Sequence, residues 1–145
     1  MTTKSSFKMD IDTRVFFEAA HRLTDYSGKC KRIHGHNWVV DIGVSADRSL
    51  DKVGFVVDFG VIKDVVNQFD HMLILKDCKE NRDIAVGIPS DWIVWTPFNP
   101  TCEEFARFIV QEIASVTGLD KVDISVTVHE TYKPEAMSSA TSSGI

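Results

Sequence analysis

The sequence lacks any apolar run long enough to cross a membrane, and its N-terminal stretch MTTKSSFKMD lacks the apolar core of a signal peptide. Cysteine is scarce: Cys30, Cys78 and Cys102 are odd in number and widely spaced, which argues against a disulfide framework and favours a reducing cytoplasm. Basic residues are outnumbered, and the net charge of −5 gives no general attraction to nucleic acid or to an anionic membrane. A polyanionic small ligand would therefore need a local basic patch.

The composition that remains is ordinary for a soluble globular protein, with 43% hydrophobic and 26% charged residues. A chain of 145 residues is the size of one domain and can bury a working core without disulfides or metal. No internal repeat and no linker divides it. We therefore expect a single domain over residues 1–145.

Two long segments alternate between apolar and polar residues, as half-buried strands do. In residues 7–21 the odd positions, from Phe7 to His21, are mostly apolar and the even positions mostly polar. The alternation restarts at His34 and runs to Ala46, after the turn-rich stretch TDYSGK. We expect these strands to be antiparallel neighbours.

The remaining segments predict helices and shorter strands. Asp58 precedes apolar residues at helical spacing up to Phe69, and Thr101 with Glu104 forms a capping-box pattern before a helix that continues toward Gly118. Residues 92–95 (WIVW) and 122–130 read as strands, residues 76–91 as a loop, and the Ser-rich tail as an edge strand at its start. The predicted fold is α+β, with two helices on one face of an antiparallel sheet.

Three histidines are placed to meet at the ends of the two long strands. His34 and His36 are two residues apart, so their side chains point to the same face, and His21 lies on the inward face of the preceding strand. Three histidines with one position open are the ligand set of a catalytic zinc. Two alternatives are a structural site closed by Cys30 and a set of histidines that only form hydrogen bonds.

Cys30 lies between Lys29, Lys31 and Arg32, in the loop before the second strand. Nearby cations and a nearby metal both favour thiolate over thiol, so we expect Cys30 to be the most reactive cysteine and the other two to be inert packing residues. The same three basic residues are candidates for holding a phosphate chain, or they form a solvated loop.

Two further carboxylates stand out. Asp70 next to His71 ends the first predicted helix and is suited to orienting an imidazole or relaying a proton, although a helix C-terminus also favours a cationic histidine. Glu130 falls on the same face of its predicted strand as a row of apolar residues. A carboxylate on such a face needs a partner, and the N–H groups of a ligand would provide one. The alternative is that Glu130 reaches solvent at the end of the strand. Its neighbour His129 falls on the polar face and reads as a surface residue.

With these residues in view, nearly the whole chain resembles the 6-pyruvoyltetrahydropterin synthase family, and within it the bacterial branch that makes 6-carboxytetrahydropterin for queuosine biosynthesis. The matching stretches, in order, are FFEAAHRL, CKRIHGHNW, GFVVDFGVIK, FDHMLI, NPTCEEFA and VTVHET. The three-residue gap between Cys30 and His34 resembles the bacterial branch. The longer loop from Lys76 to Trp95 and the Ser-rich tail depart from the family pattern.

The resemblance implies the tunnelling fold, assembled as a homo-oligomeric barrel of trimers or hexamers with active sites between subunits. It implies zinc on His21, His34 and His36, and the substrate 7,8-dihydroneopterin triphosphate. Cys30 would be the general base, Asp70 and His71 would complete a proton relay, and Glu130 would anchor the pterin ring with a contact from Thr101. Loss of triphosphate and acetaldehyde would give 6-carboxy-5,6,7,8-tetrahydropterin.

Three other functions stay open on the sequence. The pyruvoyl product would keep the family and change the branch. A zinc hydratase or hydrolase with Glu130 as base would explain the histidines but would leave Cys30, Asp70 and His71 without a role. A non-catalytic pterin- or nucleotide-binding protein with a structural zinc would use Cys30 as a metal ligand.

Overall fold

The two long alternating segments are the central pair of strands in the fold. The computed structural model describes residues 7–118, 122–131 and 138–144. In it, β1 (Phe7–His21) and β2 (His34–Arg48) pair antiparallel over their whole length, from Phe7 opposite Arg48 to His21 opposite His34. The predicted period of two is confirmed, because Val15, Phe17 and Ala19 are buried on one face of β1 while the residues between them are exposed.

The sheet is mixed, which corrects the expectation of a purely antiparallel sheet. Over the described ranges its strand order is β4-β3-β1-β2-β5-β6. Two short strands, β3 (Met72–Lys76) and β4 (Ile93–Thr96), pair in parallel, β3 with the end of β1 and β4 with β3. The predicted strand at 92–95 corresponds to β4. The segment MLILK was missed because a strand of five residues with no polar alternation gives no period-two signal.

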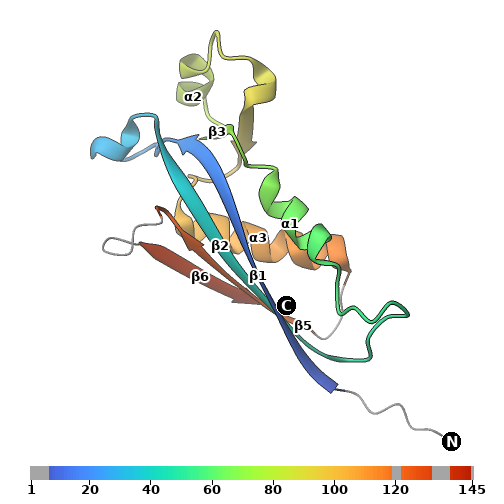
Figure 1. Ribbon diagram of the computed structural model, residues 1–145. Helices are drawn as coiled ribbons and strands as arrows, with labels where there is room; N and C mark the ends of the chain where they lie inside the picture. The colour runs from blue at the N-terminus through green and yellow to red at the C-terminus, as the bar shows by residue number, and fades with distance from the viewer. Residues whose placement is uncertain (1–6, 119–121, 132–137, 145) are drawn as a thin grey trace, which may run out of the picture.

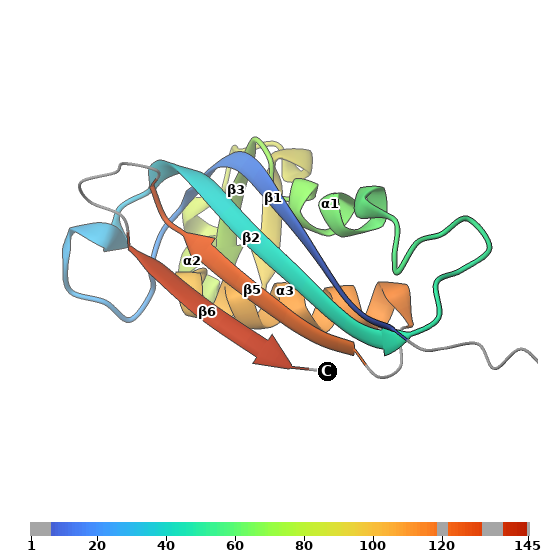
Figure 2. The same cartoon turned by 60° about the horizontal axis from the view of Figure 1, so that its bottom comes forward.

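The other side of the sheet is antiparallel throughout. Strand β5 (Val122–His129) pairs with β2, and β6 (Ser139–Gly144) pairs with β5 as the edge strand (Figure 2). The expected strand at 122–130 and the pairing of the Ser-rich tail are both confirmed. The positions of β5 alternate between buried and exposed, so only one of its faces contributes to the core.

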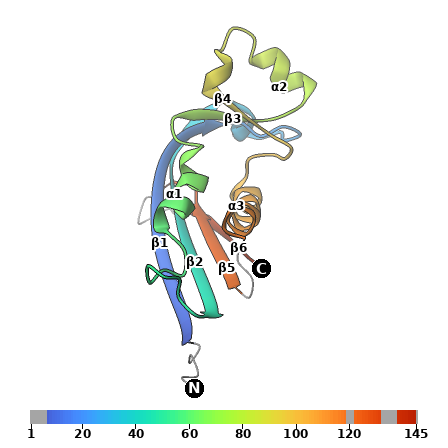
Figure 3. The same cartoon turned by 90° about the vertical axis from the view of Figure 1, so that its right-hand side faces the viewer.

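Two longer helices pack on the concave face of the curled sheet (Figure 3). Helix α1 (Phe59–Asn67) begins at Asp58, whose carboxylate accepts a hydrogen bond from the Gly60 amide at 2.7 Å. Helix α3 (Cys102–Thr117) begins at Thr101, whose hydroxyl accepts from the Glu104 amide at 3.2 Å, and it ends at Gly118 with φ of 57°. Both predicted helices are thus confirmed.

The segment expected to be a loop, residues 76–91, contains a third α-helix. This helix, α2 (Lys79–Ile84), lies at the top of the view in Figure 1 and is followed by the 3-10 helix η2 (Ser90–Trp92). Another 3-10 helix, η1 (Lys29–Lys31), carries Cys30. Six residues are fewer than two helical turns, so α2 has no apolar periodicity to find in the sequence.

The core between sheet and helices is built around aromatic residues. Trp38, Phe69 and Phe105 are fully or almost fully buried, and the Phe17 ring stacks on Trp38 with centroids 5.7 Å apart. Burying a large apolar side chain contributes about 1.5–3 kcal/mol, so these residues contribute strongly to the stability of the domain. All three cysteines are free, and no helix in the described ranges is both long and apolar enough to span a membrane.

Candidate metal centre

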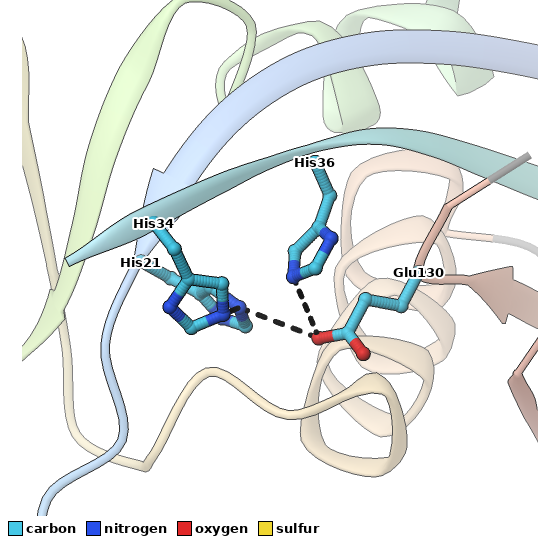
Figure 4. Close-up of side chains that lie close together, drawn as sticks. All are labelled: His21, His34, His36 and Glu130. Atoms are coloured by element: carbon cyan, nitrogen blue, oxygen red, sulfur yellow. Dashed lines mark hydrogen bonds and ion pairs between the residues drawn. The ribbon is translucent and has the colours of Figure 1, made fainter. Parts of the chain in front are cut away.

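The register of β1 and β2 brings the three predicted histidines together. His21 is the last residue of β1 and lies directly opposite His34, the first residue of β2, while His36 follows on the same face (Figure 4). The ring centroids are 4.6 Å apart for His21 and His34, 5.2 Å for His21 and His36, and 4.9 Å for His34 and His36. A cross-strand pair and its same-face neighbour therefore form one cluster, as the alternation predicted.

Each ring is oriented by a hydrogen bond at its Nδ1 atom. His21 Nδ1 lies 2.8 Å from the carbonyl oxygen of Pro100, and His34 Nδ1 lies 2.7 Å from that of Arg32. A carbonyl only accepts, so both Nδ1 atoms carry the proton and the neutral rings present a lone pair at Nε2. His36 Nδ1 lies 2.8 Å from the Thr131 hydroxyl. This is how histidine ligands of metals are commonly held.

The Nε2 atoms face one another in a way that calls for a cation. The Nε2 atoms of His21 and His34 are 3.1 Å apart, and Nε2 of His36 is buried with no hydrogen-bond partner in the described part of the chain. Lone pairs at this distance repel unless a cation lies between them. Ligand atoms about 2.0–2.1 Å from a tetrahedral zinc are roughly 3.3 Å from one another, so the spacing fits a zinc ion.

Glu130 supplies a fourth group. Its Oε1 atom lies 3.3 Å from Nε2 of His21 and 3.3 Å from Nε2 of His36 (Figure 4), and all four ligand atoms lie within 4.8 Å of one another. The neighbouring histidines, His21 first, lower the pKa of Glu130 and keep it ionised. The strand alternation predicted that Glu130 faces inward, but it did not indicate that this carboxylate joins the histidines.

The centre is seated on the aromatic core. The Trp38 ring lies 5.0 Å from the ring of His21 and 5.4 Å from that of His36, both edge to face. Burial lowers the pKa of His36 from its ordinary value, with Glu130 opposing the shift and the other two histidines adding to it. A neutral imidazole is the form that binds metals, so this environment favours a ligand over a surface cation.

A small cavity of about 190 Å³ adjoins the cluster. His21 and Glu130 form one part of its wall, and Thr101 and Cys102 at the start of α3 form another. Thr101 and Glu130, which the resemblance assigns to pterin binding, therefore line one cavity. Burial, with the negative charge of Glu130 and Glu103, raises the pKa of Cys102 to about 12, which agrees with an unreactive packing thiol.

Cys30 is half-buried in η1 and is not among the groups that meet at the cluster in the described residues. One alternative from the sequence was a structural site in which Cys30 is the fourth metal ligand. In the structure the fourth group near the three histidines is Glu130, and Cys30 is not part of the cluster. Lys29, Lys31 and Arg32 are exposed around the cysteine. The basic loop is therefore open to solvent beside the histidine strand.

Asp70 and His71 lie in the turn between α1 and β3, beyond the helix end where they were expected, because α1 stops at Asn67. Asp70 accepts a hydrogen bond from the Glu18 amide at 3.0 Å, which is the main cause of its lowered pKa, and its other oxygen lies 3.0 Å from His71 Nδ1. The His71 side chain is 79% exposed. This pair does not join the histidine cluster of its own chain, although His71 and His36 line the same groove of about 660 Å³.

His129 corrects the expectation of a surface residue. Its side chain is only 15% exposed, and Nε2 lies 3.0 Å from Asp41, which is also bound by Arg14. Its phase on the polar face of β5 was predicted correctly. The side chain is covered because Asp41 on the neighbouring strand reaches across to it. Thr131, which orients His36, was not indicated by any sequence pattern.

Known proteins share this sequence and fold. Residues 10–140 match the family described as 6-pyruvoyl tetrahydropterin synthase. A protein of Rickettsia felis named 6-carboxy-5,6,7,8-tetrahydropterin synthase is 39% identical over 106 residues, covering 69% of this chain and 76% of its own. A protein of Pyrococcus horikoshii named putative 6-carboxy-5,6,7,8-tetrahydropterin synthase is 30% identical, covering 90% and 89%.

Solved structures agree on the fold. The 6-pyruvoyl tetrahydropterin synthase of Plasmodium falciparum superposes with a TM-score of 0.62 at 21% identity, covering 93% of this chain and 98% of its own. That of Caenorhabditis elegans gives a TM-score of 0.60 at 21% identity, covering 99% and 100%. The predicted tunnelling fold is therefore confirmed, and the sequence match over residues 10–140 shows that this chain belongs to the 6-pyruvoyl tetrahydropterin synthase family.

Proposed function

We propose that the chain is a zinc-dependent 6-carboxy-5,6,7,8-tetrahydropterin synthase that converts 7,8-dihydroneopterin triphosphate, with release of acetaldehyde and triphosphate, in queuosine biosynthesis. The observation that carries the proposal is the convergence of three Nε2 atoms and one carboxylate oxygen within 4.8 Å. The names of the sequence relatives, 36–39% identical in four Rickettsia proteins, support this product over the pyruvoyl one.

The donor set supports zinc as the metal. Three neutral imidazoles suit a divalent ion of borderline softness, and they leave the fourth position of a tetrahedral site open to the substrate. When bound, zinc would polarise hydroxyl groups of the substrate side chain and so lower the cost of removing a proton from the adjacent carbon. His21, His34 and His36 hold the ion in this proposal, with ring orientations fixed by the three Nδ1 hydrogen bonds described above.

The remaining residues bind the substrate and move protons. Glu130 and Thr101 hold the amino-pyrimidine edge of the pterin in the small cavity that they line. Cys30 is the general base, and the exposed Lys29, Lys31 and Arg32 around it bind the triphosphate. In this scheme Glu130 lies between the ring pocket and the metal ligands, and it positions the substrate side chain at the centre.

Asp70 and His71 act in this scheme as a proton relay for a neighbouring subunit. Their position outside their own chain's cluster, together with the high exposure of His71, supports a trimer or hexamer in which sites form between subunits. The Asp70 carboxylate fixes the tautomer of His71 by accepting from Nδ1, which leaves Nε2 free to exchange a proton.

The test is to incubate the zinc-loaded protein with 7,8-dihydroneopterin triphosphate and to identify products by mass spectrometry. Cys30→Ala is expected to lose at least 10²-fold in turnover, the scale of a general base, while it keeps its zinc. Cys78→Ala is the matched control, because Cys78 is also half-buried but lies at the start of α2. The pyruvoyl product would keep the family and move the branch, and full activity of Cys30→Ala would refute the role of Cys30.

A second candidate is a zinc hydratase or hydrolase with Glu130 as general base. The distance of 3.3 Å from Glu130 Oε1 to two Nε2 atoms favours it. It gives no role to Cys30, Asp70 or His71, so it predicts that Cys30→Ala keeps its activity. A non-catalytic pterin-binding protein would bind a dihydropterin without turnover.

A further inference from the structure

Arg22, the residue after the first histidine of the cluster, has a buried guanidinium group with three sets of partners. Only 7% of its side chain is exposed. Its Nε donates to the carbonyl oxygen of Lys31 at 2.7 Å, one terminal nitrogen donates to the Asn81 side-chain oxygen, and the other donates to Glu80 at 3.0 Å. A buried charge is tolerated only when it is paired and hydrogen-bonded in this way, so the arrangement of its partners is strongly specified.

One of these bonds reaches the turn that carries Cys30. The carbonyl of Lys31 is held by Arg22, and the carbonyl of Cys30 itself accepts from the Leu23 amide at 2.9 Å. The two residues that follow His21 therefore bind the carbonyl groups of two consecutive residues of the turn, Cys30 and Lys31. Beyond these bonds, the turn 28–32 is closed by its own short-range bonds, from Lys31 to Gly28 and from Arg32 to Lys29.

The other two bonds reach α2, the helix that was expected to be a loop. Asn81 is fully buried, and its amide group donates to the carbonyl of Lys76 at 2.8 Å, so its side chain is fixed at both ends. Glu80 lies beside it and is 59% exposed. In Figure 1, α2 and the turn with η1 lie at the same end of the sheet. Arg22 thus links α2 to the turn.

We propose that Arg22 is a positioning residue that, with Asn81 and Glu80 of α2, holds the Cys30 turn in place beside the metal centre. This gives the long segment 76–95 a function. Its helix α2 binds Arg22 and so stabilises the turn that carries the Cys30 thiol, instead of extending the substrate entrance. The planar guanidinium suits this role because it donates from three separate nitrogens, whereas the ammonium of a lysine donates from a single atom and cannot reach all three acceptors from one position. The inference relies on the proposed role of Cys30, and its test includes readouts that do not.

The experiment is amide hydrogen exchange, zinc content and steady-state kinetics on the full chain with Arg22→Lys. Exchange of the Leu23 amide is expected to accelerate about tenfold or more, while strand amides near His36 keep their protection. We expect kcat to fall at least about tenfold with KM within about twofold and zinc content unchanged, since a misplaced catalytic group costs turnover before binding. Alkylation of Cys30 by iodoacetamide, resolved by peptide mass, should be severalfold faster.

Arg82→Lys is the matched control. Arg82 is on α2, as Glu80 and Asn81 are, and pairs with Asp77, but its side chain is 51% exposed and, among the described residues, it forms no hydrogen bond or ion pair with the turn 28–32. All readouts should remain at wild-type values. Equal Leu23 exchange and equal kcat in folded Arg22→Lys would overturn the proposal.

Two further outcomes separate this proposal from the proposed function. If Arg22→Lys does not fold, Glu80→Ala removes the exposed acceptor, and unchanged Leu23 exchange and Cys30 alkylation in that variant would overturn the proposal. If the wild type has no turnover with the pterin substrate, the proposed function fails. Faster exchange of the Leu23 amide and faster alkylation of Cys30 in Arg22→Lys would still support the proposal that Arg22 positions the turn.

Discussion

Zinc should raise the thermal stability of the metal-depleted protein through the three histidines, and one substitution should remove the effect. The change is His36→Ala, because His36 has the one Nε2 atom of the cluster that is buried without a hydrogen-bond partner in the described ranges. The ring has one surface against Trp38 and contributes no charge at neutral pH, since its pKa is lowered. Its loss therefore mainly removes a ligand.

The magnitude follows from mass action. A ligand at about one hundred times its Kd stabilises the folded state by about 2.7 kcal/mol, which raises the Tm of a domain of this size by roughly 8 °C at about 2–4 °C per kcal/mol. Loss of one metal ligand should weaken zinc binding at least about a hundredfold, because loss of a group that only hydrogen-bonds a ligand already weakens metal binding by up to about a hundredfold. At the same zinc concentration the gain then falls to about 0.4 kcal/mol, or roughly 1 °C.

The assay is a thermal unfolding scan with and without zinc, calibrated by titration calorimetry to fix the zinc concentration relative to Kd. The control is His71→Ala, because His71 is exposed and lies outside the cluster. His71→Ala should keep the full zinc-induced shift. An undiminished shift in His36→Ala, or an equal loss in His71→Ala, would refute the assignment of the centre.

Two smaller predictions test electrostatics away from the metal. At pH 8, iodoacetamide should leave Cys102 unmodified in the folded protein, because its pKa is raised to about 12 and the thiol stays protonated; peptide mass analysis that finds Cys102 alkylated as fast as in urea would contradict the burial argument. Asp41→Asn should lower the free energy of unfolding at pH 7 by about 0.5 kcal/mol in urea titrations, a small value because the pair with Arg14 is partly exposed. The Arg14 hydrogen bond lowers the pKa of Asp41, so this contribution is present above its ordinary value of 3.8 and should disappear as the pH falls below it; a difference that persists in acid would show a packing effect instead.

The parts of the fold that were predictable from sequence are those in which an apolar pattern repeats over many residues. Fifteen alternating residues in β1 and fifteen in β2 determine which face is buried, and the histidine cluster follows once these strands pair. The caps at Asp58, Thr101 and Gly118 were equally visible. Strand β3 and helix α2 were not, because five or six residues hold too little periodicity to distinguish a strand or helix from a loop.

Glu130 shows a different limit. Its inward phase was read correctly, but its approach to His21 and His36 depends on how β5 is placed beside β2, with Val39 opposite His129. That register joins residues about ninety positions apart in the chain and is determined by packing in the core. No local pattern indicates it, and the same holds for Thr131, whose hydroxyl orients His36.

The end of β1 holds two separate turns in place next to the strand that carries His21. The backbone of Glu18 binds the turn with Asp70 and His71 twice, accepting from the His71 amide at 2.6 Å and donating to Asp70 at 3.0 Å. Three residues later His21 enters the metal cluster, and the next residue, Arg22, holds the Cys30 turn.

Residues 18–22 thus bind both turns directly and carry one histidine of the cluster. Within this segment, residues 19–21 pair with β2 on one side and with β3 on the other. A strand paired on both sides has little freedom to shift, and catalytic groups lose activity with displacements of about 1 Å. Turns are ordinarily the more mobile parts of a fold. Attachment of the Cys30 turn to this strand would restrict that mobility. In the proposed function, the thiol on the turn could then act on the same substrate as a metal ion bound by the histidines of the strands.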